Sequence, residues 1–289
     1  MKIIVIVGPS GVGKTKLSIS LAKALNAVII NGDSMQVYRG LDIGTAKVKE
    51  NEKEGIKHYL LDIKDPRDNY TIYDYQKDGR MLLEKFQKQN QNVIIVGGSG
   101  LYIKSLLYDY RFQDEEKMDT FDELSNEEIL KKIKMIHDTN IHVNNRKRLV
   151  RELNKIKNGS IISSDINKPL YDFVVIGLTT NREKLYEVVD NRVDKMIEEG
   201  LLLEVKKLYE NHIRSKAILT GIGYKELYQY FDSEITLDDA IELIKKNTRH
   251  FIKRQYTFFN HQMNVNWINV DFDNFDNTIL EAKNIIEKY

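Results

Sequence analysis

The stretch KIIVIVGPSGVGKT, residues 2–15, decides the fold. Its first half is a continuous apolar run, typical of a strand buried on both faces of a parallel sheet. Its second half matches G-x-x-x-x-G-K-[ST], a glycine-rich turn between a strand and a helix. The amides of such a turn point at phosphate oxygens, and the helix N-terminus adds partial positive charge. The stretch therefore predicts a phosphate-binding loop (P-loop) made of Gly8, Pro9, Ser10, Gly11, Val12, Gly13, Lys14 and Thr15.

Two side chains of this loop carry the chemistry that phosphate binding needs. The Lys14 ammonium supplies a point charge to the terminal phosphate, and the Thr15 hydroxyl can ligate Mg²⁺. The alternative is a chance glycine-rich turn. The apolar run before the loop and the helical spacing of the leucines after it favour the phosphate site. We therefore expect a phosphate ligand and Mg²⁺ as cofactor.

Apolar runs and helical patterns alternate along most of the chain. The apolar runs that follow the first are read as strands at residues 27–30, 92–96 and 173–178, with weaker candidates at 58–63 and 265–270. The helical patterns between them cover residues 71–89, 100–108 and 182–199. This alternation predicts an α/β fold, with a P-loop-type parallel sheet core flanked by helices.

One segment departs from the alternation. Residues 111–169 are polar and helix-prone and contain no buried-strand pattern, which indicates a small helical insertion. The catalytic core is then expected at residues 1–110 and 170–289. The insertion contains NNRKRLVRELNKIK, residues 144–157, a strongly basic stretch in a chain whose net charge is only +1. A local patch of this kind, and not the total charge, is what a polyanion meets.

Composition excludes several classes of protein. With no cysteine, the chain has no disulfide, cysteine metal site or thiolate nucleophile. The six histidines show no metal-ligand spacing, so no zinc site is assigned. The N-terminus lacks a signal-peptide pattern, and no apolar run approaches the ~20 residues that span a bilayer. We expect a cytoplasmic monomer.

A P-loop indicates phosphate but does not define the reaction. In typical NTPases a second strand ends in an acidic Mg²⁺ partner, whereas here the run at 92–96 ends in Gly97-Gly98-Ser99. The acidic residue is Asp33, after the run at 27–30. It is expected at the carboxyl edge of the sheet, beside the P-loop, where ligands bind in such folds. The alternative for Asp33 is a turn or helix-cap residue.

The segment DSMQVYRGLDIGTAK, residues 33–47, resembles the signature of bacterial tRNA dimethylallyltransferases. Further blocks follow in the order of that family. They are HYLLDI (58–63), VGGSGLY (96–102), NRVDKM (191–196), GLLLEV (200–205), GYKE (223–226) and KRQ (253–255). Each block is moderately specific, and the ordered set is highly specific.

The resemblance implies a reaction and its catalytic residues. The P-loop would hold the pyrophosphate of dimethylallyl pyrophosphate. Asp33 would be the general base that takes a proton from an adenine amine of tRNA, just 3′ of the anticodon at position 37. Arg192 would reach the pyrophosphate or a tRNA phosphate, so the catalytic set is Asp33, Lys14, Thr15 and Arg192.

The resemblance also implies tRNA contacts. Residues Asp33, Ser34, Met35 and Gln36 would line the pocket for the extruded base. Ser99, where the family usually has threonine, would contact tRNA near that pocket. Within the insertion, the corresponding contacts are Lys147, Arg148 and Arg151. The chain departs from the family at residues 141–145, which lack the usual proline and aspartate, at Phe258 in place of tryptophan, and in an insertion that looks shorter.

Three other functions fit parts of the pattern. A kinase of a small metabolite would use Lys14 and Thr15 similarly. A prenyltransferase of free adenine nucleotides would share the pocket but not need the basic insertion. A non-catalytic RNA-binding protein would not need an intact Lys14 and Asp33. The basic residues Arg249, Lys253 and Arg254 are open between a solvated helix face and a phosphate-binding face.

Overall fold

The structure is a computed structural model that describes residues 1–110, 112, 119–157 and 167–289. Its contacts divide the chain into two compact units, Met1–Tyr108 with Pro169–Tyr289, and Asp109–Lys168. The first unit is called the core and the second the insertion, and each is described by itself. The sequence predicted the insertion at residues 111–169.

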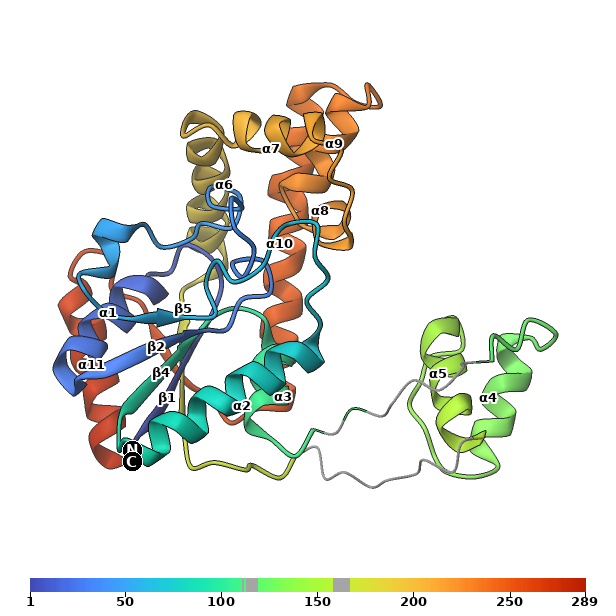
Figure 1. The fold of residues 1–289 in the computed structure, drawn as a ribbon, viewed down its shortest axis with the longest axis horizontal. Coiled ribbons are helices and arrows are strands. Elements are labelled where there is room, and N and C mark those ends of the chain that lie inside the picture. Colours follow the sequence, from blue (N-terminus) through green and yellow to red (C-terminus); the bar gives the residue numbers. More distant parts are fainter. Residues whose placement is uncertain (111, 113–118, 158–166) are drawn as a thin grey trace. The chain divides into compact units, whose positions relative to one another are not determined.

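In the described residues of the core, six strands form one parallel sheet, which confirms the predicted fold class (Figure 1). The strands are β1 (Ile3–Val7), β2 (Ala27–Asn31), β3 (His58–Tyr59), β4 (Asn92–Val96), β5 (Val174–Thr179) and β6 (Asn266–Asn269). Their order is β3-β2-β4-β1-β5-β6. The central strands β1, β4 and β2 end side by side, so the loops that follow them meet at one sheet edge.

The run at 58–63 is shorter as a strand than the sequence predicted. Only His58 and Tyr59 pair with β2, at Ile29 and Ile30. Leu60 and Asp62 then adopt positive φ angles of 60° and 54°, a left-handed backbone that cannot continue a strand. The polypeptide turns away at this point and lies along the loop that follows β2, where Ile63 and Lys64 donate their amides to Val37.

Helices cover both faces of the sheet (Figure 1). Alternate residues of β1 point to opposite sides: Ile4 and Ile6 pack with α1 (Lys14–Leu25) and α11 (Phe275–Lys288). Ile3, Val5 and Val7 belong to the other apolar cluster, with α2 (Ile72–Lys88) and α3 (Gly100–Leu107). Two-sided burial explains why the strands read as continuous apolar runs in the sequence.

The remaining helices of the core follow β5. They are α6 (Arg182–Glu198), α7 (Leu201–Glu210), α8 (Lys216–Thr220), α9 (Tyr224–Phe231) and the long α10 (Leu237–Gln262), while a short 3-10 turn occupies Glu50–Lys53. Figure 1 shows them rising from one end of the sheet. None of the helices in the described residues is long and apolar enough to cross a membrane.

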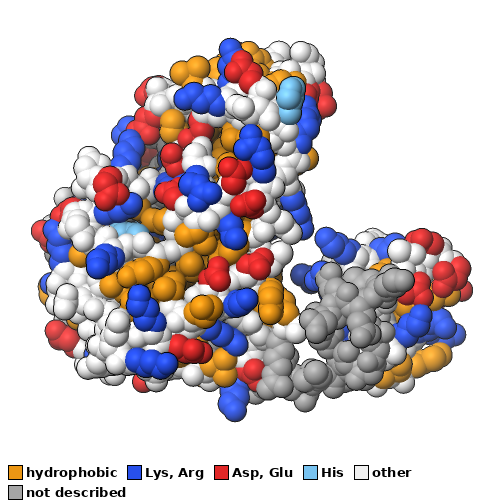
Figure 2. All heavy atoms as spheres, viewed as in Figure 1, with side chains coloured by type: hydrophobic (Ala, Val, Ile, Leu, Met, Phe, Trp, Pro, Cys, Tyr) orange, Lys and Arg blue, Asp and Glu red, His pale blue; other side chains and the backbone are white. Residues whose placement is uncertain are grey.

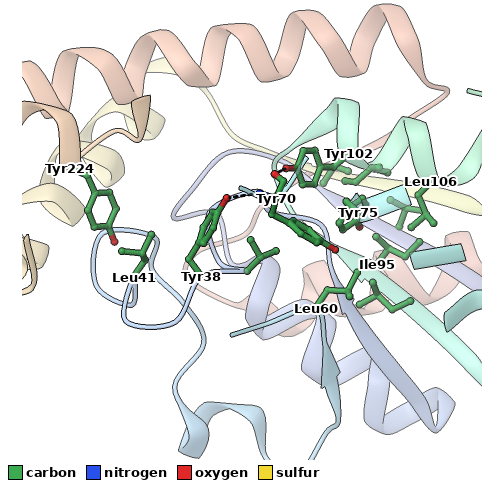
Figure 3. Packing of buried hydrophobic residues seen from close by; sticks show 14 of the residues in the cluster. Tyr38, Leu41, Leu60, Tyr70, Tyr75, Ile95, Tyr102, Leu106 and Tyr224 are labelled. Carbon is green, nitrogen blue, oxygen red and sulfur yellow. Dashed lines mark hydrogen bonds between the residues drawn. The ribbon is translucent and has the colours of Figure 1, made fainter. Parts of the chain in front are cut away.

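Buried tyrosines hold the loop after β2 against α2 and α3 (Figure 3). The Tyr70 amide donates to the Tyr38 hydroxyl at 3.2 Å, and the Tyr102 hydroxyl donates to the Tyr70 carbonyl at 3.2 Å. The ring of Tyr102 packs on that of Tyr75, with 4.7 Å between centroids. These contacts place the loop that starts at Asp33 over the carboxyl edge of the sheet.

The insertion contains α4 (Asn126–Lys134) and α5 (Arg146–Lys157). They share a small apolar core of Phe121, Ile129, Ile133, Leu149 and Leu153. Arg146 is a structural member of the basic stretch, since its guanidinium donates to the carbonyls of Phe121 and Leu124 at 2.7 and 2.9 Å.

Candidate active site

The P-loop leaves β1 at Gly8 and enters α1 at Lys14. Gly13 has a φ of 89°, and a Cβ there would lie 2.5 Å from the ring of Phe275, which is the first residue of α11. Both constraints favour glycine. The Lys14 ammonium folds back over the loop and donates to the Pro9 carbonyl at 2.6 Å. The predicted turn between strand and helix is therefore present, with α11 supporting it from behind.

A cavity of about 700 Å³ opens beside this loop, at the carboxyl edge of the sheet. It brings together residues from β-strand ends and helices that are far apart in the sequence. The predicted site residues among its lining are Ser10, Gly11, Gly13, Lys14, Thr15, Asp33, Gln36 and Arg192. Gly8, Pro9 and Val12 are buried and form the body of the loop.

Positive charge gathers at one end of the cavity. The pKa of Lys14 is lowered to about 8, first by burial and then by the nearby charge of Arg192, while Asp33 acts in the opposite direction. Burial also lowers the pKa of Arg192. The Arg192 Nε is buried and has no hydrogen-bond partner among the described residues. Two close cations with an unsatisfied donor form a site for an anion.

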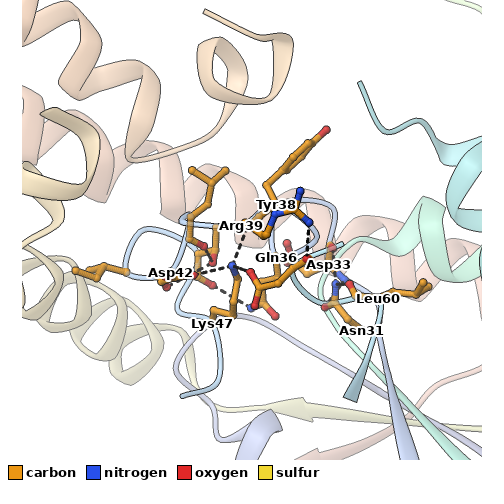
Figure 4. A network of polar contacts seen from close by, with 12 residues as sticks. Asn31, Asp33, Gln36, Tyr38, Arg39, Asp42, Lys47 and Leu60 are labelled. Atoms are coloured by element: carbon orange, nitrogen blue, oxygen red, sulfur yellow. Dashed lines mark hydrogen bonds and ion pairs between the residues drawn. The ribbon is translucent and has the colours of Figure 1, made fainter. Parts of the chain in front are cut away.

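Asp33 lines the same cavity, close enough to Lys14 for the two charges to interact. Its backbone is fixed by Asn31, which accepts from the Asp33 amide at 3.0 Å and donates to the Asp33 carbonyl at 2.9 Å (Figure 4). Its carboxylate accepts the Met35 amide at 2.8 Å. Burial raises the pKa of Asp33, and this outweighs the opposing effects of the Met35 amide and Lys14. A carboxylate whose ionised form is disfavoured is a stronger base than an exposed one.

The loop after Asp33 is tied to the turn after β4. The Ser99 Oγ accepts the Ser34 amide at 3.0 Å and lies 3.2 Å from the Ser34 hydroxyl. The Gln36 amide donates to the Thr45 carbonyl at 3.0 Å. Met35 turns away toward the segment before α9, since a Cβ on Gly221 would lie 2.6 Å from the Met35 methyl. Ser34 and Ser99 are thus bonded to each other, and of the predicted residues Ser34, Met35, Gln36 and Ser99 only Gln36 is among those that line the cavity.

A buried lysine fixes the far end of this loop. The Lys47 ammonium donates to the Tyr38 carbonyl at 2.7 Å, to Asp42 at 2.7 Å and to Asp62 at 2.5 Å (Figure 4). A buried ammonium with three acceptors is fully satisfied. Lys47 therefore fixes the conformation of the loop, and its ammonium is not available to a ligand.

The other predicted contacts are basic residues. Lys147, Arg148 and Arg151 are exposed on α5, away from its buried leucines. On the face shown in Figure 2, basic and acidic side chains are interspersed, in keeping with the net charge of +1.

The basic residues of α10 have different surroundings. Arg249 is not a free basic residue, because its Nη1 pairs with both carboxylate oxygens of Asp190 at 2.6 and 2.7 Å and so joins α10 to α6. Lys253 and Arg254 are exposed.

Gln255 and Phe251 also line the cavity, although neither was assigned a role from the sequence. Both come from α10, which crosses the sheet edge. The signal for Gln255 is its place on the buried stripe of the helix, between Ile252 and Phe259. A polar side chain on an apolar stripe needs a partner, so this spacing alone could have marked Gln255 as a candidate.

In the described residues, no group of three or more aspartate, glutamate or histidine side chains is arranged to hold a metal. Thr15 lines the cavity, and its hydroxyl is the group that would hold a Mg²⁺ ion there, since this ion keeps several waters and takes its remaining ligands from substrate phosphates.

Comparison with known proteins identifies the family of the chain. A family described as IPP transferase matches residues 36–262. The tRNA dimethylallyltransferase of Anoxybacillus flavithermus is 46% identical over 98% of this chain and 93% of its own length.

Two solved structures are similar over nearly the whole chain. The tRNA isopentenylpyrophosphate transferase of Bacillus halodurans is 40% identical, with a TM-score of 0.78, and the match covers 99% of this chain and 96% of that one. A eukaryotic dimethylallyltransferase acting on tRNA is 27% identical, with a TM-score of 0.80 over 100% of this chain and 80% of that one. The resemblance found in the sequence is thereby confirmed, and the chain belongs to the IPP transferase family, that of the tRNA dimethylallyltransferases.

Proposed function

We propose that this protein transfers the dimethylallyl group of dimethylallyl pyrophosphate to the exocyclic amine of adenine 37 of tRNA. The products are N6-dimethylallyladenosine and pyrophosphate. One observation carries the proposal: Lys14 and Arg192, with its unpaired Nε, share a cavity with the partly buried carboxylate of Asp33. The names of the relatives support the same substrate pair.

The reaction needs a site for a departing anion. When the allylic C–O bond breaks, its electron pair leaves with the pyrophosphate, and positive character develops on the allylic carbon. The amides of the P-loop, Lys14 and Arg192 stabilise the negative charge as it develops. Mg²⁺ on Thr15 would neutralise part of the pyrophosphate charge when it is bound.

It also needs a positioned nucleophile. The lone pair of an adenine amine is delocalised into the ring, so the amine is a weak nucleophile. Asp33 accepts a hydrogen bond from the amine, holds it in line and takes its proton as the C–N bond forms. The raised pKa of Asp33 suits this role, because a stronger base takes the proton more readily.

The adenine has to leave its stack to reach the cavity. An anticodon loop is single-stranded, so unstacking one base from it costs little, and such loops are the usual targets of sequence-specific RNA recognition. Gln36, which lines the cavity, and the bonded pair of Ser34 and Ser99 on the same loop and the next turn are the polar side chains that we expect to meet this base. Lys147, Arg148 and Arg151 meet phosphates of the tRNA.

One experiment tests the proposal against its alternatives. The protein is mixed with dimethylallyl pyrophosphate labelled in the allyl group and with tRNA, AMP or no acceptor, and in parallel with γ-labelled ATP. We expect label in tRNA alone, at one adenine, with no phosphoryl transfer from ATP. Label in AMP at a comparable rate would favour a nucleotide prenyltransferase. Phosphoryl transfer to any acceptor would favour a kinase.

A further inference from the structure

Gln255 presents an unsatisfied acceptor to the cavity. It lies on α10, the residue is 6% exposed, and it lines the cavity with Asp33 and Lys14. Its Nε2 donates to the Gly98 carbonyl at 3.0 Å. Its Oε1 is buried and has no partner in the described part of the chain. Because a carbonyl can only accept, the Gly98 contact fixes the amide orientation and leaves the oxygen unpaired.

The turn that Gln255 grips is the same turn that positions Asp33. A Cβ on Gly98 would lie 2.2 Å from the Gln255 Nε2, so glycine is required for this approach. Next to it, Ser99 accepts the amide of Ser34, the residue after Asp33. The same Cβ would lie 3.9 Å from the carbonyl of Gly8, where the P-loop begins. Gln255 therefore lies where the phosphate site and the base site meet.

The unpaired Gln255 Oε1 is an acceptor, so it can bind only a ligand that carries a hydrogen-bond donor. Pyrophosphate offers only acceptors, so it cannot satisfy Gln255 Oε1. The adenine amine offers two N–H groups in the plane of the ring, and Asp33 takes only one of them. Once the bound base has displaced water from this part of the cavity, the second N–H needs an acceptor of its own.

We propose that Gln255 Oε1 accepts the second N–H of the target amine, the hydrogen that stays on nitrogen in the product. This inference rests on the proposed function. With one N–H held by Asp33 and the other by Gln255, the nitrogen lone pair stands perpendicular to the ring plane, toward the allylic carbon. Gln255 is then a specificity residue for a primary amine.

Pairing the two N–H groups with Asp33 and Gln255 explains why each amine receives only one dimethylallyl group. When the C–N bond forms, one proton moves to Asp33, and the electron pair of that N–H remains on nitrogen. The secondary amine keeps one hydrogen, which stays on Gln255. A base that already carries an N6 substituent has one N–H for two acceptors, so either Asp33 or Gln255 is left unpaired, and leaving a buried polar group unpaired is costly.

The test is a double-mutant cycle in which the Gln255 side chain and the target amine are removed separately and together. Affinities are measured for anticodon stem–loops with adenine or purine at the target position, because purine lacks the amine. In Gln255→Leu, the preference for adenine over purine should fall about tenfold, the effect of one buried hydrogen bond. Gln76→Leu is the matched control, since the buried Gln76 amide also donates to a backbone carbonyl, that of Ser105, at 2.8 Å. This control should keep the wild-type preference.

If Gln255 only supports the Gly98 turn, Gln255→Leu will weaken adenine and purine binding equally, which overturns the inference. A second measurement needs no variant: wild-type protein should bind a stem–loop with N6-methyladenine about tenfold more weakly than one with adenine. Equal affinity would also overturn it. Transfer of labelled dimethylallyl to the adenine stem–loop by wild-type protein checks the proposed function separately.

Discussion

The Tyr224 hydroxyl donates a 2.7 Å hydrogen bond to Glu204, whose carboxylate also accepts three consecutive backbone amides. These amides belong to Asp42, Ile43 and Gly44, in the loop that lines the cavity after Asp33. The contact is close, since a Cβ on Gly44 would lie 2.7 Å from the Tyr224 ring. Helices α7 and α9 thus hold a loop that lies about 160 residues earlier in the chain.

The protein should become less stable when the contacts of Glu204 with this loop are removed. Glu204→Ala leaves three amides and the Tyr224 hydroxyl without their acceptor and should lower the free energy of unfolding by about 4 kcal/mol, at ~1 kcal/mol for each lost bond. Tyr224→Phe removes a single donor and should cost ~1 kcal/mol. Denaturant unfolding measures both. Tyr230→Phe on the same helix is the control and should be neutral, and a loss as large as that of Tyr224→Phe would contradict the assignment.

Asp33→Asn should lower the single-turnover rate by ~10²–10⁴, the usual contribution of a positioned general base. The amide keeps the size and can accept a hydrogen bond but cannot take the proton. Affinities for tRNA and dimethylallyl pyrophosphate should change much less. If high Mg²⁺ restores the rate, Asp33 is a metal partner and not the base.

The raised pKa of Asp33 has two consequences of known sign. Activity requires the ionised form, so kcat/KM should fall as pH is lowered, with a midpoint above the ordinary aspartate value of ~4. Stability changes in the opposite direction: the folded state binds this proton more tightly than the unfolded state, so ionisation of Asp33 destabilises the fold. Asp33→Asn should therefore lose the acidic limb of the pH profile and raise Tm at neutral pH. A midpoint at or below ~4, or a lower Tm, would argue against a desolvated carboxylate.

Lys14→Ala should act on the allylic substrate and spare tRNA binding. Loss of a preorganised charge contact typically costs a factor of ~10²–10³ in rate. The measurement is kcat/KM for dimethylallyl pyrophosphate beside the dissociation constant for tRNA. Lys23→Ala, an exposed lysine on the same helix, is the control. An equal loss of tRNA affinity would mean that Lys14 contacts tRNA, which contradicts its assignment to the pyrophosphate.

Neutralising Arg148 and Arg151 together should weaken tRNA binding and flatten its salt dependence by up to about two phosphate contacts. Lys131 and Lys132 on α4 are exposed lysines of the same insertion, so Lys131→Gln with Lys132→Gln makes the same change in charge. The control should leave the salt slope nearly unchanged. Equal slopes in both double variants would mean that α5 has no special role.

The sequence predicted those parts of the site that depend on local pattern. The P-loop is a contiguous motif, and Asp33 follows an apolar strand that could be placed beside it. Gln255 and Glu204 escaped prediction because their partners, Gly98 and residues 42–44, are more than 150 positions away. The end of β3 at Tyr59 was missed because a left-handed residue such as Leu60 leaves no mark in an apolar run.

The contact between Gly13 and Phe275 links the order of synthesis to the assembly of the site. The P-loop leaves the ribosome before the side chain that backs it, because Phe275 lies some 260 residues after Gly13 in the chain. Strand β6, on one edge of the sheet, and α11 arrive in the same late interval. Pairings between such distant segments form slowly, since a long loop has to close first. A nascent chain therefore lacks the support behind its P-loop until α11 has docked.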